Sequence, residues 1–187
     1  MNDKHYHSWQ DIETMCTEIV LQMYNDNWRP DYIVGITRGG NVPASIISNM
    51  TGIRCEALKV KLRDAEPEEE CETNCWMAED AFGYIGEIEQ ESYGSRWDPG
   101  LRKNILIVDD INDSGATFNW IKENWKSVCL PNEDSWNTVW GKNVRFAALA
   151  DNFSSEFGGV SYYAHEINKA EDDIWQVFPW ENVGAYS

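Results

Sequence analysis

The sequence predicts an α/β fold in which a mainly parallel, twisted sheet is flanked by helices. Stretches typical of strands and of helices alternate along the chain, which is the pattern of a parallel sheet. The strands are continuous apolar runs such as Ile105–Val108, and such runs are typical of strands buried on both faces. With 187 residues, 42% of them hydrophobic, the chain is predicted to form one domain.

The first expected elements are a helix, a strand and a second helix. Apolar residues recur at helical spacing from Trp9 to Met23, and Ser8 with Asp11 has the pattern of a capping box, so a helix is expected over about 8–24. A short buried strand is expected over 32–36 and a tight loop over 37–40. The second helix, over about 42–50, should end at Gly52.

The remaining elements follow from the same patterns. Residues 57–62 alternate apolar and basic side chains, as in a strand with one wet face. Segment 64–100 is acidic and rich in glycine, and a connection of that length is typical of a lid or of disorder. The other expected elements are a buried strand at 104–110, a loop at 111–116, a helix at 117–128 with Phe118, Ile121, Trp125 and Val128 on one face, a strand at 144–150, and β-leaning pieces at 161–164 and 174–178.

The charge and the hydropathy restrict the possible partners. The net charge is −17, with 15 Lys and Arg against 32 Asp and Glu, so neither nucleic acid nor an anionic membrane is expected as the main partner. One locally positive, anion-binding pocket remains compatible with this charge. No apolar run approaches the roughly 18 residues of a membrane span, and the start of the chain lacks a signal-peptide core. A cytoplasmic protein is therefore expected.

The five cysteines do not form an even set. They are Cys16, Cys55, Cys71, Cys75 and Cys129. For a cytoplasmic chain of this size, reduced thiols are expected. Cys71 and Cys75 have the spacing of half a zinc site, but no second Cys or His pair lies near them in the sequence, so two loop thiols are the favoured interpretation.

The loop after the strand at 104–110 carries the strongest chemical signal. Its small and hydroxylated residues, from Asp113 through Ser114, Gly115 and Ala116 to Thr117, open a helix, and such a loop offers backbone N–H groups to a phosphate. The preceding acids, Asp109 and Asp110, suit sugar hydroxyls or a Mg²⁺ that carries a diphosphate. On the residues alone, an Asp-rich turn with Asp113 or Ser114 as helix N-cap is the alternative.

Residues 105–117, ILIVDDINDSGAT, resemble the signature of the type I phosphoribosyltransferases. The resemblance implies that family's fold. It also implies that Asp113 to Thr117 hold the 5′-phosphate of phosphoribosyl diphosphate. Asp109 and Asp110 would then meet the ribose hydroxyls directly or through Mg²⁺.

A second loop is similar to the family's diphosphate loop. It contains Arg38, Gly39 and Gly40. Arginine provides a planar fork for phosphate oxygens, and glycines allow the backbone N–H groups to face an anion. Lys59, Lys61 or Arg63 could add positive charge, although solvated strand residues are an equally good interpretation of these three.

The end of the chain resembles that of bacterial xanthine-guanine phosphoribosyltransferases. In the segment DIWQVFPWE at 173–181, the resemblance implies that Trp175 stacks on a purine and that Gln176 offers backbone groups to the base edge. The family lysine that holds the 6-oxo group is replaced here by Asp151 or Asn152. Lys169 is a possible substitute from elsewhere, and a non-purine acceptor remains an alternative.

The resemblance implies a Mg²⁺-dependent transfer of the phosphoribosyl group to a nucleobase, with release of diphosphate. Asp113 would be the general base. Residues 1–187 would form one domain, with 64–103 as a lid that excludes water and 165–187 as a base-pocket tail. Family members are commonly dimers or tetramers, so a homo-oligomer is expected. A nucleotide-sensing protein without catalysis and, more distantly, a kinase or nucleotidase stay open as alternatives.

Overall fold

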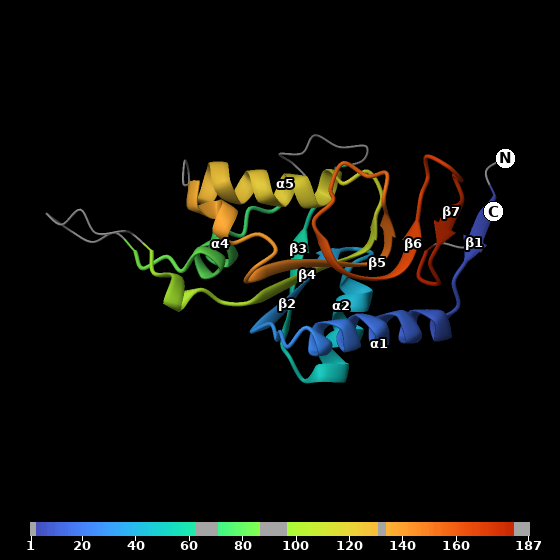
Figure 1. The fold of residues 1–187 in the computed structure, drawn as a ribbon, viewed down its shortest axis with the longest axis horizontal. Helices are drawn as coiled ribbons and strands as arrows, with labels where there is room; N and C mark the ends of the chain where they lie inside the picture. Colours follow the sequence, from blue (N-terminus) through green and yellow to red (C-terminus); the bar gives the residue numbers. More distant parts are fainter. Residues whose placement is uncertain (1–2, 63–70, 87–96, 131–133, 182–187) are drawn as a thin grey trace, which may run out of the picture.

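A five-stranded, entirely parallel sheet forms the centre of the fold (Figure 1). The structure is a computed structural model that describes residues 3–62, 71–86, 97–130 and 134–181. The strand order is β3-β2-β4-β5-β6. The bounds of these strands are β2 Tyr32–Thr37, β3 Cys55–Lys59, β4 Ile105–Asn112, β5 Val144–Asn152 and β6 Val160–Ile167. The expected α/β fold with a mainly parallel sheet is confirmed.

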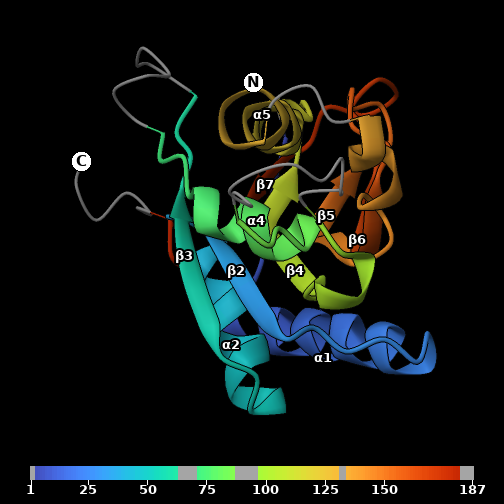
Figure 2. The same ribbon diagram turned by 90° about the vertical axis from the view of Figure 1, so that its left-hand side faces the viewer.

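Helices cover both faces of this sheet (Figure 2). Helices α1 (Trp9–Asn25) and α2 (Asn41–Thr51) pack on one face, and α4 (Cys75–Phe82) and α5 (Ala116–Asn124) pack on the other. Three short helical turns also lie in the described part of the chain, at Pro99–Leu101, Trp125–Cys129 and Asp134–Thr138. Because both faces of the sheet are covered, the strands are apolar along most of their length.

A second, two-stranded sheet lies beside the large one. Strand β1 (Lys4–Tyr6) pairs in parallel with β7 (Trp175–Val177), so the two ends of the described chain meet here (Figure 1). The sequence predicted a β-leaning piece around 174–178, but it gave no signal for β1. A three-residue strand with all its side chains exposed has no buried run that could reveal it.

The boundaries of α1 and α2 follow local rules. Ser8 and Asp11 form the expected capping box at the start of α1, and Gly52 ends α2 with a φ of 75°, a conformation that glycine adopts without steric cost. The predicted apolar stripe of α1 is buried from Ile12 to Met23, but Trp9 is 56% exposed. Trp9 lies in the first turn, beyond the part of α1 that the sheet covers, and it contacts Trp180 instead.

Three other expectations need correction. The strand expected at 57–62 lies at 55–59. The helix expected at 117–128 changes after Asn124 into a π-helical turn, and this turn leaves Val128 59% exposed rather than on the buried face. Helix α4 lies inside the segment expected to be a lid or disordered. Its Met77, Ala78, Ala81 and Phe82 are buried in the core next to α5.

The expectation of five reduced thiols is wrong for two cysteines. Cys75 at the start of α4 forms a disulfide with Cys129 at the end of the π-helical turn. The two residues are 54 positions apart, and only the packing of α4 on the end of α5 brings them together. Cys16, Cys55 and Cys71 are free. With Cys75 in a disulfide, the alternative of a zinc site at Cys71 and Cys75 is overturned.

In the described part of the chain, no helix has both the length and the apolar character needed to cross a membrane.

Candidate active site at the carboxyl ends of the strands

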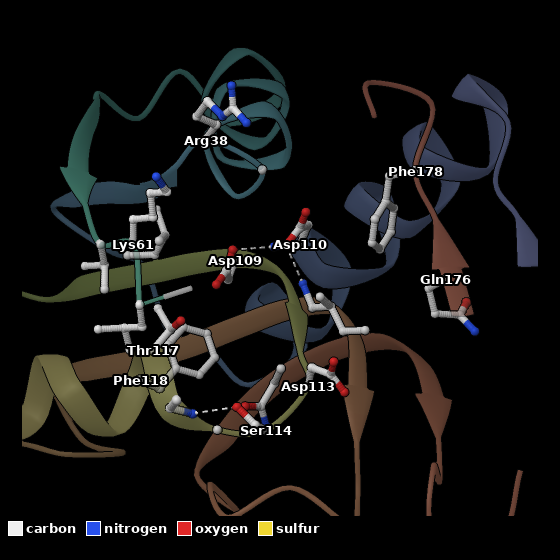
Figure 3. A pocket seen from close by; sticks show the side chains of 18 of the residues that line it. Arg38, Lys61, Asp109, Asp110, Asp113, Ser114, Thr117, Phe118, Gln176 and Phe178 are labelled. Carbon is white, nitrogen blue, oxygen red and sulfur yellow. Dashed lines mark hydrogen bonds between the residues drawn. The ribbon is translucent and has the colours of Figure 1, made fainter. Parts of the chain in front are cut away.

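A cavity of about 830 Å³ opens where β2, β3 and β4 end (Figure 3). In parallel sheets, ligands bind outside the carboxyl ends of the strands. Of the residues that the resemblance assigns to the phosphate, the ribose, the diphosphate and the base, all except Gly40 line this cavity. These lining residues are Arg38, Gly39, Asp109, Asp110, Asp113, Ser114, Gly115, Ala116, Thr117, Trp175 and Gln176.

The turn from β4 into α5 forms one wall. Gly115 is the N-cap of α5, with a φ of 86°, and a Cβ on it would lie 2.5 Å from the backbone nitrogen of Phe157. Only glycine combines this φ with so close an approach. The N-cap is therefore neither Asp113 nor Ser114. The Ser114 hydroxyl instead accepts a hydrogen bond from the N–H of Ala116 at 3.3 Å. The helix N-terminus remains turned toward the cavity.

The buried side chain of Asn112 holds this turn in place through hydrogen bonds. Its side-chain amide donates to the Asp151 carboxylate at 2.8 Å, and to the Ser155 hydroxyl and the Phe157 carbonyl at 2.9 Å each. Asn112 is buried, so these bonds satisfy a polar group that would otherwise be costly to bury. They fix the end of β4 against residues 155–157, and Gly115 packs on the same segment.

Asp109 and Asp110 lie in the middle of the cavity (Figure 3). The N–H of Asp110 donates to the Asp109 carboxylate at 2.9 Å, and the N–H of Ile111 donates to the Asp110 carboxylate at 2.9 Å. Burial raises the pKa of Asp110, because its charged form loses solvation. The two backbone hydrogen bonds therefore orient both carboxylates.

The second loop has glycine at positions 39 and 40 because it packs closely against Asp109 and Asp110. A Cβ on Gly39 would collide with the Asp110 carboxylate, and a Cβ on Gly40 would lie 2.5 Å from the Val108 carbonyl oxygen. Glycine at both positions therefore lets this loop lie directly on the end of β4. Gly40 is buried behind the cavity as the N-cap of α2. The peptide bond between Thr37 and Arg38 is cis.

Among the described residues, four cations and four acids line this cavity. The cations are Arg38, Lys59, Lys61 and Lys169, of the 15 lysines and arginines in the chain, and the acids are Asp109, Asp110, Asp113 and Glu181. Arg38 and Lys61 lie on the far side of the acid pair from Asp113 and Ser114 (Figure 3). In a chain of net charge −17, these cations make the cavity suited to an anionic ligand that extends over several groups.

The opposite wall comes from the end of the chain. Trp175 is 42% exposed and Gln176 is 6% exposed, and the side chain of Gln176 points away from Asp110 and Asp113 (Figure 3). Phe178, which is fully buried, also lines the cavity. Phe178 and Glu181 both line the cavity but were not predicted as site residues, although both lie in the segment at 173–181 that resembles the family.

Lys169 enters the site from the turn between β6 and β7. Its ammonium lies 2.9 Å from the Asp113 carboxylate and 5.4 Å from the centre of the Trp175 ring. The side chain of Lys169 is only 15% exposed. A cation thus stands between the predicted general base and the predicted stacking residue.

Asp151 and Asn152, which stand in place of the family lysine, do not face the cavity. Asn152 is 5% exposed. Its amide group donates to the Asp113 carbonyl at 2.9 Å, and its oxygen accepts from the N–H of Lys169 at 3.0 Å. Asp151 is bonded to Asn112, and burial raises its pKa. Neither residue lines the cavity, and Asn152 instead holds Asp113 and Lys169 in place.

The carboxylates of Asp109 and Asp110 are side chains in the cavity that suit the expected Mg²⁺. Within the residues that the structure describes, no group of three or more His, Cys, Asp or Glu side chains forms a metal site. Mg²⁺ in phosphoryl-binding sites usually takes one or two carboxylates and completes its shell with water and substrate oxygens. Asp109 and Asp110 are two such carboxylates in the cavity, so the residues present fit this ion.

Comparisons with known proteins agree with the fold. The model of the phosphoribosyl transferase domain matches residues 3–181. The hypoxanthine-guanine phosphoribosyltransferase of Schizosaccharomyces pombe is 25% identical over 94% of this chain and 88% of its own length. The xanthine-guanine phosphoribosyltransferase of Cereibacter sphaeroides is 28% identical over 87% of this chain and 74% of its own length.

A solved structure extends the comparison to the whole fold. The purine phosphoribosyltransferase of Pyrococcus horikoshii superposes with a TM-score of 0.61 at 23% identity, over 99% of this chain and 98% of that one. This likeness concerns the arrangement of the elements.

Proposed function

Because the chain belongs to the phosphoribosyl transferase domain family, we propose that it transfers the phosphoribosyl group of phosphoribosyl diphosphate to a nucleobase and releases diphosphate. A purine such as guanine, xanthine or hypoxanthine is the favoured acceptor, as in the names of the matched relatives. The observation that carries the proposal is the single cavity in which a helix N-terminus, an acid pair, an arginine loop and an aromatic wall meet.

Each part of the cavity suits one part of the substrate. The N–H groups at the start of α5, with Ser114 and Thr117, suit the 5′-phosphate. Asp109 and Asp110 lie where carboxylates would accept hydrogen bonds from the ribose hydroxyls. Arg38, with Lys59 and Lys61 beside it, suits the diphosphate, because a guanidinium binds two phosphate oxygens at once.

The proposed reaction is a displacement at C1 of the ribose. A nitrogen of the base forms the new bond to C1 while the bond from C1 to the diphosphate oxygen breaks, and the diphosphate leaves with that electron pair. Asp113, on the base side of the acid pair, takes the proton that the base nitrogen loses. Arg38 stabilises the charge that develops on the diphosphate.

Asp109 and Asp110 would hold Mg²⁺. When bound, this ion neutralises charge on the diphosphate and so assists its departure. Backbone donors already orient both carboxylates, so little rearrangement is needed to meet a cation at this position.

The acceptor side is formed by the tail. We assign Trp175 to stacking on the purine and the backbone of Gln176 to its edge, since the Gln176 side chain is bonded elsewhere. The ammonium of Lys169, held beside Asp113, would donate to an oxo group on the base. This favours 6-oxopurines over adenine, whose amino group at that position is a donor.

The remaining parts of the proposal concern the chain as a whole. Residues 1–187 act as one domain, with the tail at 165–187 closing the base pocket. The lid at 64–103 excludes water from the activated sugar; α4 belongs to the core rather than to the moving part, and 63–70 and 87–96 lie outside the described residues. A cytoplasmic homo-oligomer, dimer or tetramer, completes the proposal.

The test is release of diphosphate from phosphoribosyl diphosphate with Mg²⁺ and each of guanine, hypoxanthine, xanthine, adenine, orotate and uracil. Release is expected with at least one oxopurine, together with the matching nucleotide. Binding of phosphoribosyl diphosphate without release for any base would indicate a sensor instead. Absence of binding would overturn the proposal altogether.

The general base is tested by Asp113→Asn. This variant should fold normally and lower kcat by about 10²–10⁴-fold, the usual contribution of a general base. Asp172→Asn, which changes an exposed acid of the turn between β6 and β7, is the matched control and should leave kcat unchanged. A kcat equal to that of the unmodified protein in Asp113→Asn would remove Asp113 from this role.

A further inference from the structure

The wall of the cavity formed by β7 is held by the beginning of the chain. Strand β1 pairs with β7 so that His5 lies opposite Gln176 and Tyr6 opposite Val177. A further hydrogen bond lies at each end of this pairing. The N–H of Trp175 donates to the Asp3 carbonyl at 2.8 Å, and the N–H of His7 donates to the Val177 carbonyl at 2.9 Å. Every residue of β7 is therefore fixed by a partner in the first seven residues.

His7 makes the side-chain contacts of this junction. It is 6% exposed, and its Nε2 lies 2.8 Å from Oε1 of Gln176. Its ring stacks on Phe178, with centroids 5.1 Å apart and planes inclined by 14°. Gln176 and Phe178 both line the cavity, so His7 contacts the wall of the site from behind.

The hydrogen bond fixes the orientation of Gln176. Burial, together with the nearby rings of His5 and His165, lowers the pKa of His7. Because Oε1 of Gln176 can only accept, Nε2 of His7 is the donor in this bond. The amide group of Gln176 donates in turn to the Ile174 carbonyl at 3.4 Å. With both ends of its side chain bonded, Gln176 presents its backbone to the cavity.

We propose that His7 is a positioning residue for the nucleobase subsite: by bonding the Gln176 side chain and stacking on Phe178, it sets where the β7 wall lies. This inference rests on the proposed function. It is specific to the acceptor side, because the loops assigned to the phosphoribosyl side follow β2 and β4 of the large sheet, whereas the β7 wall belongs to the small sheet.

The test compares His7→Leu with His7→Gln in steady-state kinetics on the full chain. Leucine keeps much of the volume but leaves Oε1 of Gln176 buried without a donor, which is unfavourable. We expect the KM for the base to rise about 10-fold in His7→Leu, with the KM for phosphoribosyl diphosphate and kcat within about twofold of the unmodified protein. His7→Gln restores a donor and should recover most of this loss.

Two further variants complete the design. Glu13→Gln changes an exposed residue of the neighbouring helix α1 and should leave the KM for the base unchanged. If His7→Leu does not fold, His7→Asn takes its place, because its shorter amide does not reach Gln176. Parallel changes in both KM values, or the same loss in His7→Gln as in His7→Leu, would indicate a merely structural role and overturn the inference.

The two proposals fail differently. If the unmodified protein uses a base and His7→Leu matches it in the KM for that base, the inference about His7 is wrong and the proposed function stands. If the unmodified protein uses no base, the proposed function is wrong, and the role of His7 falls with it.

Discussion

Asp113, Asn152 and Lys169 form one unit although they come from the loop after β4, the end of β5 and the turn after β6. Asn152 bonds the backbone of both other residues, and the carboxylate of Asp113 meets the ammonium of Lys169. Truncating any of the three would therefore disturb the others, because bonded neighbours couple. Lys169 is the member whose side chain lies close both to the proposed general base, Asp113, and to the proposed stacking residue, Trp175, so it is the most informative position for testing acceptor choice.

Lys169→Met keeps the length of the side chain and removes its charge. We expect the KM for a 6-oxopurine to rise about 10- to 100-fold, because a hydrogen bond from a charged donor is lost. The measurement is the KM for guanine or hypoxanthine beside that for adenine. Lys126→Met, at an exposed lysine of the π-helical turn, is the control. An equal KM in Lys169→Met and the unmodified protein would exclude a base contact.

Gly39 is the second informative position. In Gly39→Ala the new Cβ would collide with the Asp110 carboxylate, so the arginine loop or the acid pair must move. A displacement of this kind should lower kcat/KM for phosphoribosyl diphosphate by about 10²-fold. Gly158→Ala, where a Cβ would meet nothing within 4 Å, should behave like the unmodified protein. Unchanged kinetics in Gly39→Ala would mean that the loop does not need this close approach.

At the scale of elements, most of the large sheet could be predicted from the sequence. Strand β4 and the turn after it form one contiguous run, so apolar residues, acids and hydroxyls in series were enough to place them. Helix α4 could not be found, since eight residues between acidic and glycine-rich stretches give too short a periodic signal. The role of Lys169 depends on how the turn after β6 packs, and no local pattern encodes that.

The disulfide joins α4 to the π-helical turn that follows α5, and its effect on stability can be measured. It closes a loop of 54 residues, and a loop of this size predicts a stabilisation of about 4 kcal/mol through the entropy of the unfolded chain. Cys75→Ser should therefore lower the Tm, on the order of 10 °C for a chain of this size. Dithiothreitol should lower the Tm of the unmodified protein similarly.

Cys71→Ser is the control for this experiment, because Cys71 is a free thiol close to Cys75 in the sequence. Its Tm should match that of the unmodified protein with and without reductant. A Tm of Cys75→Ser equal to that of the oxidised unmodified protein would show that the bond does not stabilise the fold. The KM values should be unaffected, since neither Cys75 nor Cys129 lines the cavity.

At the scale of the whole molecule, the charge is distributed unevenly. The chain carries −17 overall, yet the cavity gathers Arg38, Lys59, Lys61 and Lys169. The excess of carboxylates elsewhere repels itself in the folded state more than in the expanded one. The compact state therefore carries an electrostatic cost, and this cost depends on ionic strength.

Raising NaCl from 50 to 500 mM should increase the Tm, because screening reduces this repulsion. A rise of about 2–4 °C corresponds to about 1 kcal/mol for a chain of this size. The measurement is a thermal unfolding curve at each salt concentration, with KCl at the same ionic strength to show that the effect is one of screening. A Tm that stays constant or falls with salt would contradict the idea that self-repulsion limits stability.

The pairing of β1 with β7 also has a consequence for biosynthesis. Lys4 leaves the ribosome long before its partner Trp175, which follows it by 171 residues. Strands β2 to β5, by contrast, have all their sheet neighbours available earlier. On a nascent polypeptide the β1–β7 sheet, which forms the proposed acceptor wall, is thus assembled after the large sheet, and a chain arrested before residue 175 would lack it.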